Sequence, residues 1–284
     1  MAPLTNEEIS QAVAAALAED VGTGDVTTLA TVPTAAVATA SLVAREEMVV
    51  CGLAFAGETF RQSSALIQVR SLVTDGQKVP AGTVLLEISG SARGILTGER
   101  VALNFVQRLA GVATLTSMFV AAVRGTRARI LDTRKTTPGW RRLEKYAVAC
   151  GGGTNHRIGL FDLVLIKDNH LAALRGEQPN AIAAAVQRAR QAYPALRVEV
   201  EADTLEQVGQ AVAAGADIIL LDNMNLEQLR QAVALVAGRA VTEASGGVNL
   251  KSVRGIAETG VDFISVGALT HSARAADVAL DFRE

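Results

Sequence analysis

Six short apolar runs between residues 128 and 267 each end in residues that can do chemistry. In chain order the ends carry Asp132 with Thr133, Arg134 and Lys135; Lys167; Glu201; Asp222; Ser245 with Gly246 and Gly247; and Gly267 with Ala268. A lone polar residue after a strand usually marks only the point at which the chain reaches solvent. Six in series, mixing cations, carboxylates and glycine turns, favour one functional site at the carboxyl ends of parallel strands.

Residues 134–167 hold a local excess of positive charge in a chain whose net charge is −2. The cations are Arg134, Lys135, Arg141, Arg142, Lys145, Arg157 and Lys167, and only Glu144 and Asp162 oppose them. Arg binds carboxylate or phosphate through a planar fork, and Lys adds a compact point charge. The cations that directly follow strands are therefore expected to bind anions. Those at 141–145 lie on a predicted helix, where a surface position with local pairing to Glu144 is the better interpretation.

Two glycine turns at consecutive run ends favour phosphate binding. EASGGVNL places Ser245, Gly246 and Gly247 just before a predicted helix, whose first N–H groups and dipole attract anions. SVGALTHSA repeats this arrangement at Gly267. One such turn is weak support, but two on successive loops of an α/β barrel form a familiar phosphate site.

Glu201 and Asp222 are carboxylates within this cationic set. They are candidates to bind Mg²⁺ or to accept hydrogen bonds from ribose hydroxyls. The plainer alternative for Glu201 is an ion pair with a neighbouring lysine. Glu199 lies two residues earlier and faces the same side of its strand, with no role assigned.

His156 and Arg157 follow three glycines in CGGGTNHRIG, which favours a binding role for both. His170 and His271 are weaker candidates, and the three histidines lack the HExxH spacing of a zinc site. Cys51 and Cys150 are the only cysteines, form no CxxC motif, and are expected to form no metal-ligand cluster. Two such cysteines fit a reducing compartment.

The apolar runs alternate with helical patterns, which predicts βα units. The helical stretches after Thr204, Asn225 and Asn249 are each expected to use that residue as N-cap, and Gly215, Gly238 and Gly260 are the expected C-caps. Six units predict an incomplete parallel barrel. A doubly wound open sheet is the rival, but no early GxGxxG turn supports it.

The first region, to about residue 110, mixes element types. Thr5 and Glu8 have capping-box spacing ahead of a helix that ends near Glu19. A loop is expected at 20–28, strands at 37–44, 67–73 and 83–88, and a helix from Ile95 to about Val123, with a break near Gly111 left open. The tail, residues 273–284, is expected to be a helix packing back on this region.

Composition excludes several classes of protein. The chain has 284 residues, 49% of them hydrophobic and 4% aromatic. This favours a packed globular fold and disfavours nucleic-acid binding through stacked aromatic rings or a basic surface. No uninterrupted apolar stretch of roughly 18 residues predicts a membrane span. No secretory signal is recognised at the N-terminus, so a cytoplasmic location is expected.

The motifs together resemble the quinolinate phosphoribosyltransferase family, the decarboxylating nicotinate-nucleotide pyrophosphorylases of NAD biosynthesis. The matching stretches are EDVGTGDVTT, LTGERVALNFVQRLAGVAT, ILDTRKTTPGWRRLEKYAV, GGGTNHRIGLFDLVLIKDNH, VEVEADTLEQV, DIILLDNM, EASGGVNL and ISVGALTHSA. They follow one another in a consistent order from about residue 19 to about residue 272.

The resemblance implies an N-terminal α/β sandwich domain at 1–110, with 273–284 packing back on it, and an incomplete α/β (TIM-like) barrel at 111–272. It implies a homodimer in which Arg100 enters the neighbouring subunit's site, with higher assembly left open. Quinolinate would contact Arg134, His156, Arg157 and Lys167, together with that Arg100. Thr133 and Lys135 would also line the site, and Lys135, Glu201 and Asp222 would be the catalytic residues.

For the second substrate, phosphoribosyl pyrophosphate, the resemblance implies that Glu201 and Asp222 hold the ribose hydroxyls and Mg²⁺. Phosphate would lie against Ser245, Gly246, Gly247, Gly267 and Ala268, with His271 nearby. The implied reaction gives nicotinate mononucleotide, pyrophosphate and CO₂. Three alternatives remain: a Schiff-base aldolase using Lys167, a transferase for another aromatic acid, and a non-catalytic phosphosugar-binding protein.

Overall fold

The computed structural model describes residues 3–283, which form two compact units. The first unit contains the chain up to Ser117, the segment Arg142–Gly152 and the chain from Ala273 onward. The second contains Met118–Arg141 and Gly153–Ser272. Residues 1, 2 and 284, which stand at the ends of the predicted domain ranges, lie outside the described residues.

The first unit is built on an antiparallel sheet whose strand order is β12-β1-β5-β3. Its strands are β1 (Val37–Ala44), β3 (Gln68–Ser71), β5 (Val84–Ser91) and β12 (Val278–Arg283). The short strands β2 (Met48–Val49) and β4 (Lys78–Val79) pair separately. The strands predicted at 37–44, 67–73 and 83–88 are confirmed. Leu42, Leu86 and Ile88 are fully buried in the core of this unit.

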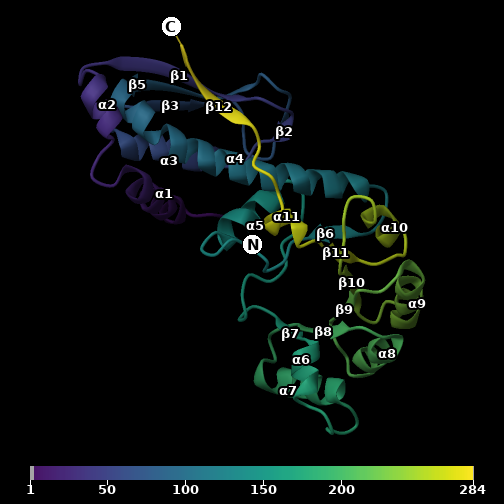
Figure 1. Cartoon of the computed structure of the whole chain (residues 1–284). Coiled ribbons are helices and arrows are strands. Elements are labelled where there is room, and N and C mark those ends of the chain that lie inside the picture. Colours follow the sequence, from purple (N-terminus) through teal and green to yellow (C-terminus); the bar gives the residue numbers. More distant parts are fainter. Residues whose placement is uncertain (1–2, 284) are drawn as a thin grey trace. The chain divides into compact units, whose positions relative to one another are not determined.

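The chain end forms a strand, so the helix expected at 273–284 is wrong. Strand β12 pairs with β1 along its length, with Leu280 opposite Leu42 (Figure 1). The pairing satisfies the backbone groups of both strands and buries Val278. Helical periodicity over so short a segment cannot compete with an open strand edge that supplies backbone hydrogen bonds.

Five helices lie wholly or mostly in the first unit. They are α1 (Asn6–Val21), α2 (Val26–Thr31), α3 (Leu53–Ser63), α4 (Ala92–Ala122) and α5 (Arg141–Cys150). The capping box of Thr5 and Glu8 is confirmed. The loop expected at 20–28 is shorter than predicted, because the Asp25 side chain caps α2 by accepting from the N–H of Thr28.

The surface positions expected at 141–145 are wrong. Lys145 and Glu144 on α5 are fully buried, and Arg141 and Arg142 are half-buried. Glu144 accepts a 2.8 Å hydrogen bond from Arg108 on α4, which is 36 residues away in the sequence. Charged residues in a helix thus face the interior here because partners from other elements reach them.

Helix α4 is continuous, so the break left open near Gly111 does not occur. The glycine is required by packing, since a Cβ at this position would collide with the backbone of Arg274 and Ala275. This helix is also long and apolar enough to cross a membrane by composition alone, although half of its most apolar window is buried inside the structure. Core helices of soluble proteins pass the same test, so this is weak support for a membrane span.

The substitution Gly111→Ala is expected to destabilise the protein by about 2 to 3 kcal/mol, because rigid backbone must move to admit the methyl group. The control is Gly57→Ala in α3, where the new Cβ would first meet the flexible end of Arg61 at 3.4 Å. Urea unfolding of both variants measures the difference. Equal stabilities would show that the chain at 274–275 yields easily.

The second unit is a six-stranded parallel sheet with the order β6-β11-β10-β9-β8-β7. The strands are β6 (Arg129–Leu131), β7 (Val164–Ile166), β8 (Val198–Ala202), β9 (Ile218–Asp222), β10 (Val241–Ser245) and β11 (Phe263–Ser265). The first strand pairs with the last, and the others follow in sequence order. This is the order of a barrel that stays open between β6 and β7 within the described residues, so the doubly wound alternative is excluded.

Helices follow these strands as predicted, with one correction. They are α6 (Asp168–Ala172), α7 (Ala181–Ala192), α8 (Leu205–Ala213), α9 (Leu226–Val236), α10 (Val253–Ala257) and α11 (Ala268–His271). The N-caps of α8 and α9 are confirmed. Asn249 is not an N-cap: its side chain accepts from Lys251 and Ser252 in a turn, and α10 begins later. The three predicted C-cap glycines all lie just beyond the assigned C-caps and have positive φ angles.

Candidate active site

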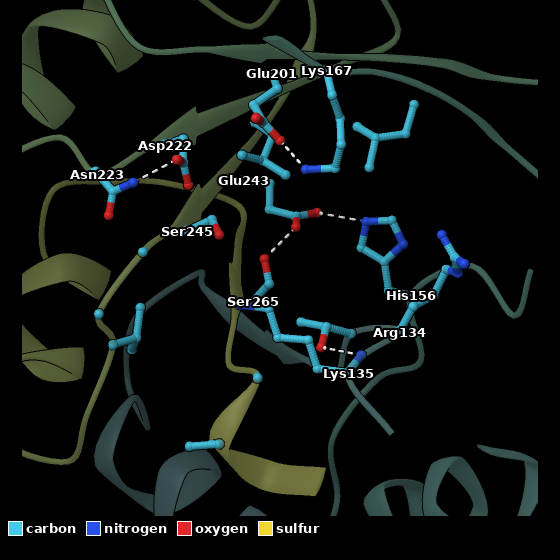
Figure 2. A pocket seen from close by; sticks show the side chains of 18 of the residues that line it. Arg134, Lys135, His156, Lys167, Glu201, Asp222, Asn223, Glu243, Ser245 and Ser265 are labelled. Atoms are coloured by element: carbon cyan, nitrogen blue, oxygen red, sulfur yellow. Dashed lines mark hydrogen bonds and ion pairs between the residues drawn. The ribbon is translucent and has the colours of Figure 1, made fainter. Parts of the chain in front are cut away.

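A cavity of about 790 Å³ opens in the second unit at the carboxyl ends of the barrel strands. Its lining residues are Thr133, Arg134, Lys135, His156, Arg157, Leu165, Lys167, Glu201, Leu220, Asp222, Asn223, Glu243, Ser245, Gly246, Gly247, Val248, Ser265, Gly267, Ala268 and His271. Such a volume suits small polar ligands. Figure 2 shows cations and carboxylates from different strands converging on this space.

Every residue that the sequence predicted to contact a substrate lines this cavity except Arg100, and the weaker candidate His170 does not line it. Arg100 is exposed on α4, in the first unit. The strand ends bring the other candidates together because parallel strands present their carboxyl ends at one edge. Asp132 also follows β6, but it is fully buried and does not line the cavity, so its role is structural. It accepts 2.7 Å and 2.8 Å hydrogen bonds from the Asn155 side chain and the His156 N–H.

The guanidinium groups of Arg134 and Arg157 lie in positions that favour an anionic ligand. The Nε of Arg134 is buried and has no hydrogen-bond partner among the described residues. Burial, and next the charge of Arg134, hold the pKa of Arg157 below its usual value. Two guanidiniums that repel each other in a partly buried site favour a ligand carrying negative charge.

Two carboxylates at the ends of the neighbouring strands β8 and β9 each interact with another side chain of the site. Glu201 pairs with the ammonium of Lys167, and Asp222 accepts a 2.5 Å hydrogen bond from the side-chain amide of Asn223 (Figure 2). The plain ion pair considered for Glu201 is therefore present. Glu201 keeps a second oxygen, and Asp222 lies half-buried at the cavity wall.

The turn at Gly246 and Gly247 has backbone angles that only glycine adopts readily. Gly246 and Gly247 have φ angles of 101° and 59°, and a Cβ on Gly246 would collide with Asn223, which itself has a φ of 54°. A Cβ at Gly267 would lie 3.1 Å from Cδ of Lys135 and 3.2 Å from Nε2 of His271. The turns thus leave backbone and cation side chains open to a ligand.

One expectation about these turns needs correction. The helix predicted directly after Gly247 begins only at Val253, so the 245–247 turn is not a helix N-terminus. An anion bound there would meet loop N–H groups without the dipole of a following helix. Gly267, in contrast, directly precedes α11.

A buried cluster under the cavity was missed from the sequence. The Nε2 of His156 lies 3.2 Å from Glu199 and 3.5 Å from Glu243, and both carboxylates are almost fully buried. Glu243 also accepts from the hydroxyl of Ser265. Neither oxygen of Glu199 has a hydrogen bond of good geometry among the described residues. The Nδ1 of His156 accepts from the N–H of Arg157 at 2.6 Å, so the ring carries its proton on Nε2, toward the carboxylates.

Burial, with the neighbouring Glu199 charge next, raises the pKa of Glu243 from an ordinary 4.5 to about 7; Asp132 adds to the rise, while His156 and Ser265 oppose it. A raised carboxyl pKa makes the folded state bind an extra proton, so stability is lost as pH rises from 4.5 to 7. The variant Glu243→Gln should lack this loss, gaining up to about 3 kcal/mol relative to the wild type between about pH 5 and about pH 8.

Urea unfolding of both proteins across that pH range measures this gain. The matched control is Glu206→Gln, an exposed residue on α8 of the same unit. It should follow the wild-type pH dependence. Parallel curves for Glu243→Gln and the wild type would show that Glu243 ionises normally.

The missed residues carried a signal in the sequence. Side chains two positions apart on a strand face the same side. Leu165, Leu220, Glu243 and Ser265 each stand two residues before a predicted site residue, and all four line the cavity. Glu199 has the same relation to Glu201. Strand alternation would thus have found the strand residues that line the inner part of the cavity.

Comparison with known proteins places the chain among characterised relatives. Two family models match it: quinolinate phosphoribosyl transferase, N-terminal domain, over residues 25–110, and the corresponding C-terminal domain over residues 112–281. The chain is 46% identical over 274 residues to the carboxylating nicotinate-nucleotide pyrophosphorylase of Mycobacterium leprae, covering 94% of each chain. It is 43% identical over 264 residues to the probable Bacillus subtilis enzyme of that name, covering 93% of this chain and 89% of the relative.

A solved structure agrees with this grouping. The nicotinate-nucleotide pyrophosphorylase from Francisella tularensis superposes with a TM-score of 0.93 at 44% identity, covering 99% of this chain and 98% of the other.

Proposed function

Because the chain belongs to the quinolinate phosphoribosyl transferase family, we propose that it transfers the phosphoribosyl group of phosphoribosyl pyrophosphate to quinolinate, with decarboxylation. The products are nicotinate mononucleotide, pyrophosphate and CO₂. The enzyme is a pentosyltransferase of NAD biosynthesis. The substrates' combined negative charge matches a cavity lined by Arg134, Lys135, Arg157 and Lys167.

The buried, unpartnered Nε of Arg134 is the observation that most directly supports binding of an anionic aromatic acid. Quinolinate is a dianion, and guanidinium forks hold carboxylates with fixed geometry. Arg134 and Arg157 bind its carboxylates in this proposal, and the imidazole ring of His156 forms a wall of the cavity beside them. Lys167 must leave Glu201 to reach the same acid, so binding exchanges one ion pair for another.

The chemical step depends on positioning and electrostatics. Departure of pyrophosphate leaves positive charge at the ribose anomeric carbon, and Glu201 and Asp222 stabilise it while accepting hydrogen bonds from the ribose hydroxyls. The pyridine nitrogen attacks that carbon. Lys135, held over Gly267, neutralises charge on the departing pyrophosphate. The ring nitrogen, now cationic, accepts the electron pair left when the 2-carboxylate departs as CO₂.

The residues around Asp222 fit Mg²⁺ carried by the phosphosugar. Glu201, Asp222, Asn223 and Ser245 line the cavity and offer hard oxygen donors, the type this ion prefers. One or two carboxylates suffice, since Mg²⁺ retains waters and uses substrate phosphates as further ligands. We therefore propose Glu201 and Asp222 as its protein ligands, where the ion would offset the pyrophosphate charge.

Arg100 is proposed to act in the site of a second copy of the chain, in a homodimer. It is exposed on α4 and lines no part of the cavity of its own chain. We also propose a cytoplasmic location for the protein. Mixing Arg100→Ala with an inactive Lys135→Ala protein should restore part of the activity, because one hybrid site regains both residues. If mixed dimers form but regain no activity, Arg100 does not act in the neighbouring subunit's site.

A turnover assay tests the function directly. Purified protein is mixed with quinolinate, phosphoribosyl pyrophosphate and Mg²⁺, and nicotinate mononucleotide and CO₂ are followed. Both products should form, and neither should form when either substrate is withheld. Folded protein that binds the phosphosugar but gives neither product would contradict quinolinate as the acceptor, and a panel of other aromatic acids would then be assayed.

A further inference from the structure

The two cysteines meet in the first unit, although the sequence led us to expect no cluster there. Both sulfur atoms and a carboxylate oxygen of Asp75 lie within 4.8 Å of one another. Cys51 is fully buried just before α3, and Cys150 is half-buried at the end of α5. All three residues belong to the first unit and none lines the cavity.

Two thiols and a carboxylate are a possible metal-ligand set, but the carboxylate here is committed elsewhere. One oxygen of Asp75 accepts from the N–H of Gly52 at 3.0 Å and from the hydroxyl of Tyr146 at 2.9 Å. The other accepts from the N–H of Leu53 at 3.2 Å. Asp75 thus anchors the start of α3 to α5. A zinc ion would have to break these bonds, and the two sulfurs alone fall short of its usual four ligands.

The two thiols differ in burial and in the direction of their pKa shifts. A hydrogen bond from Cys51 lowers the pKa of the Cys150 thiol against the opposing effect of burial, while burial raises that of Cys51. Cys150 is also the more accessible of the two. A half-buried thiol of lowered pKa beside a fully buried thiol is the arrangement found at peroxide-sensitive cysteine pairs.

We propose that Cys51 and Cys150 form a reversible intramolecular disulfide when the protein meets a peroxide. The Cys150 thiolate attacks one peroxide oxygen, which breaks the O–O bond and gives a sulfenic acid and hydroxide. The Cys51 thiol then attacks the sulfenic sulfur, forming the S–S bond and releasing water. Overall two thiols are oxidised to a disulfide, and hydrogen peroxide is reduced to two waters. The link joins the start of α3 to the end of α5, both within the first unit.

Intact-mass analysis of the folded, full-length protein tests this. Hydrogen peroxide should remove two hydrogens per chain, dithiothreitol should restore them, and peptide mapping should recover the Cys51 peptide joined to the Cys150 peptide. A disulfide between chains, or no hydrogen loss at a dose that oxidises Cys150 when it stands alone, would overturn the proposal. So would zinc retained stoichiometrically by the reduced protein through desalting.

Single variants test the order of attack. In Cys51→Ser, peroxide should leave a sulfenic acid on Cys150 that dimedone traps. In Cys150→Ser, Cys51 should take up roughly tenfold less dimedone at the same dose. Alkylation of the untreated wild type by iodoacetamide gives an independent reading, since Cys150 should react first. Equal labelling of both cysteines in these experiments would contradict the assigned roles.

Discussion

Lys135→Ala is expected to lower kcat by roughly a thousandfold while leaving the melting temperature unchanged. Lys135 is exposed at the cavity, and its side chain lies over Gly267 while its carbonyl accepts from the hydroxyl of Thr270. The backbone is therefore held in place without the ammonium, and the side chain supports no core. Its loss removes charge stabilisation where pyrophosphate departs. Steady-state kinetics and thermal unfolding on the same preparation measure both effects.

The matched control is Lys251→Ala, an exposed lysine of the same unit that does not line the cavity. It should keep wild-type turnover. Near-full activity of Lys135→Ala would remove Lys135 from the mechanism. Loss of activity together with a lowered melting temperature would instead assign it a structural role.

The substitution Glu201→Gln is expected to lower turnover without weakening the binding of quinolinate. Glu201 forms an ion pair with the Lys167 ammonium and is the proposed partner of the ribose. Its neutral isostere should lower kcat/KM for phosphoribosyl pyrophosphate by roughly a hundredfold, because stabilisation of the anomeric carbon is lost. Quinolinate should bind the variant at least as tightly as the wild type, because Lys167 no longer has to break its ion pair with Glu201 before it contacts the acid.

Calorimetry with quinolinate alone, beside steady-state kinetics, measures the two effects. Glu227→Gln serves as control, because Glu227 is exposed on α9 and outside the cavity. Equal losses in quinolinate affinity and in turnover would mean that the Lys167–Glu201 pair helps to build the acid site and does not compete with it.

Local signals predicted most elements of the fold. The six strand ends of the barrel, the capping box at Thr5 and the N-caps at Thr204 and Asn225 appear as expected. Errors arose where long-range pairing overrides local preference. The chain end became β12 because β1 offered an open edge, and Gly111 marks a crossing of the chain at Arg274 where a break in the helix had been considered.

The outer layer of the site was equally accessible to sequence reasoning, because strand ends in a barrel converge whatever the intervening sequence. The inner layer was accessible only in part. Strand alternation points Glu199 and Glu243 inward, but it cannot say that both lie within reach of the His156 ring, which belongs to a loop between strands. Burial of this cluster, and next the charge of Glu199, raises the pKa of Glu243.

The sequence by itself determined the residue types, their order on successive strands, and through them the family and the class of chemistry. Side-chain chemistry and strand periodicity are local properties, so they can be read without coordinates. Only the tertiary structure decided which distant groups share a site: Arg108 with buried Glu144, Cys51 with Cys150, and Lys167 with Glu201. Each of these depends on distances between elements far apart in the chain, and such distances are set by packing of the whole unit.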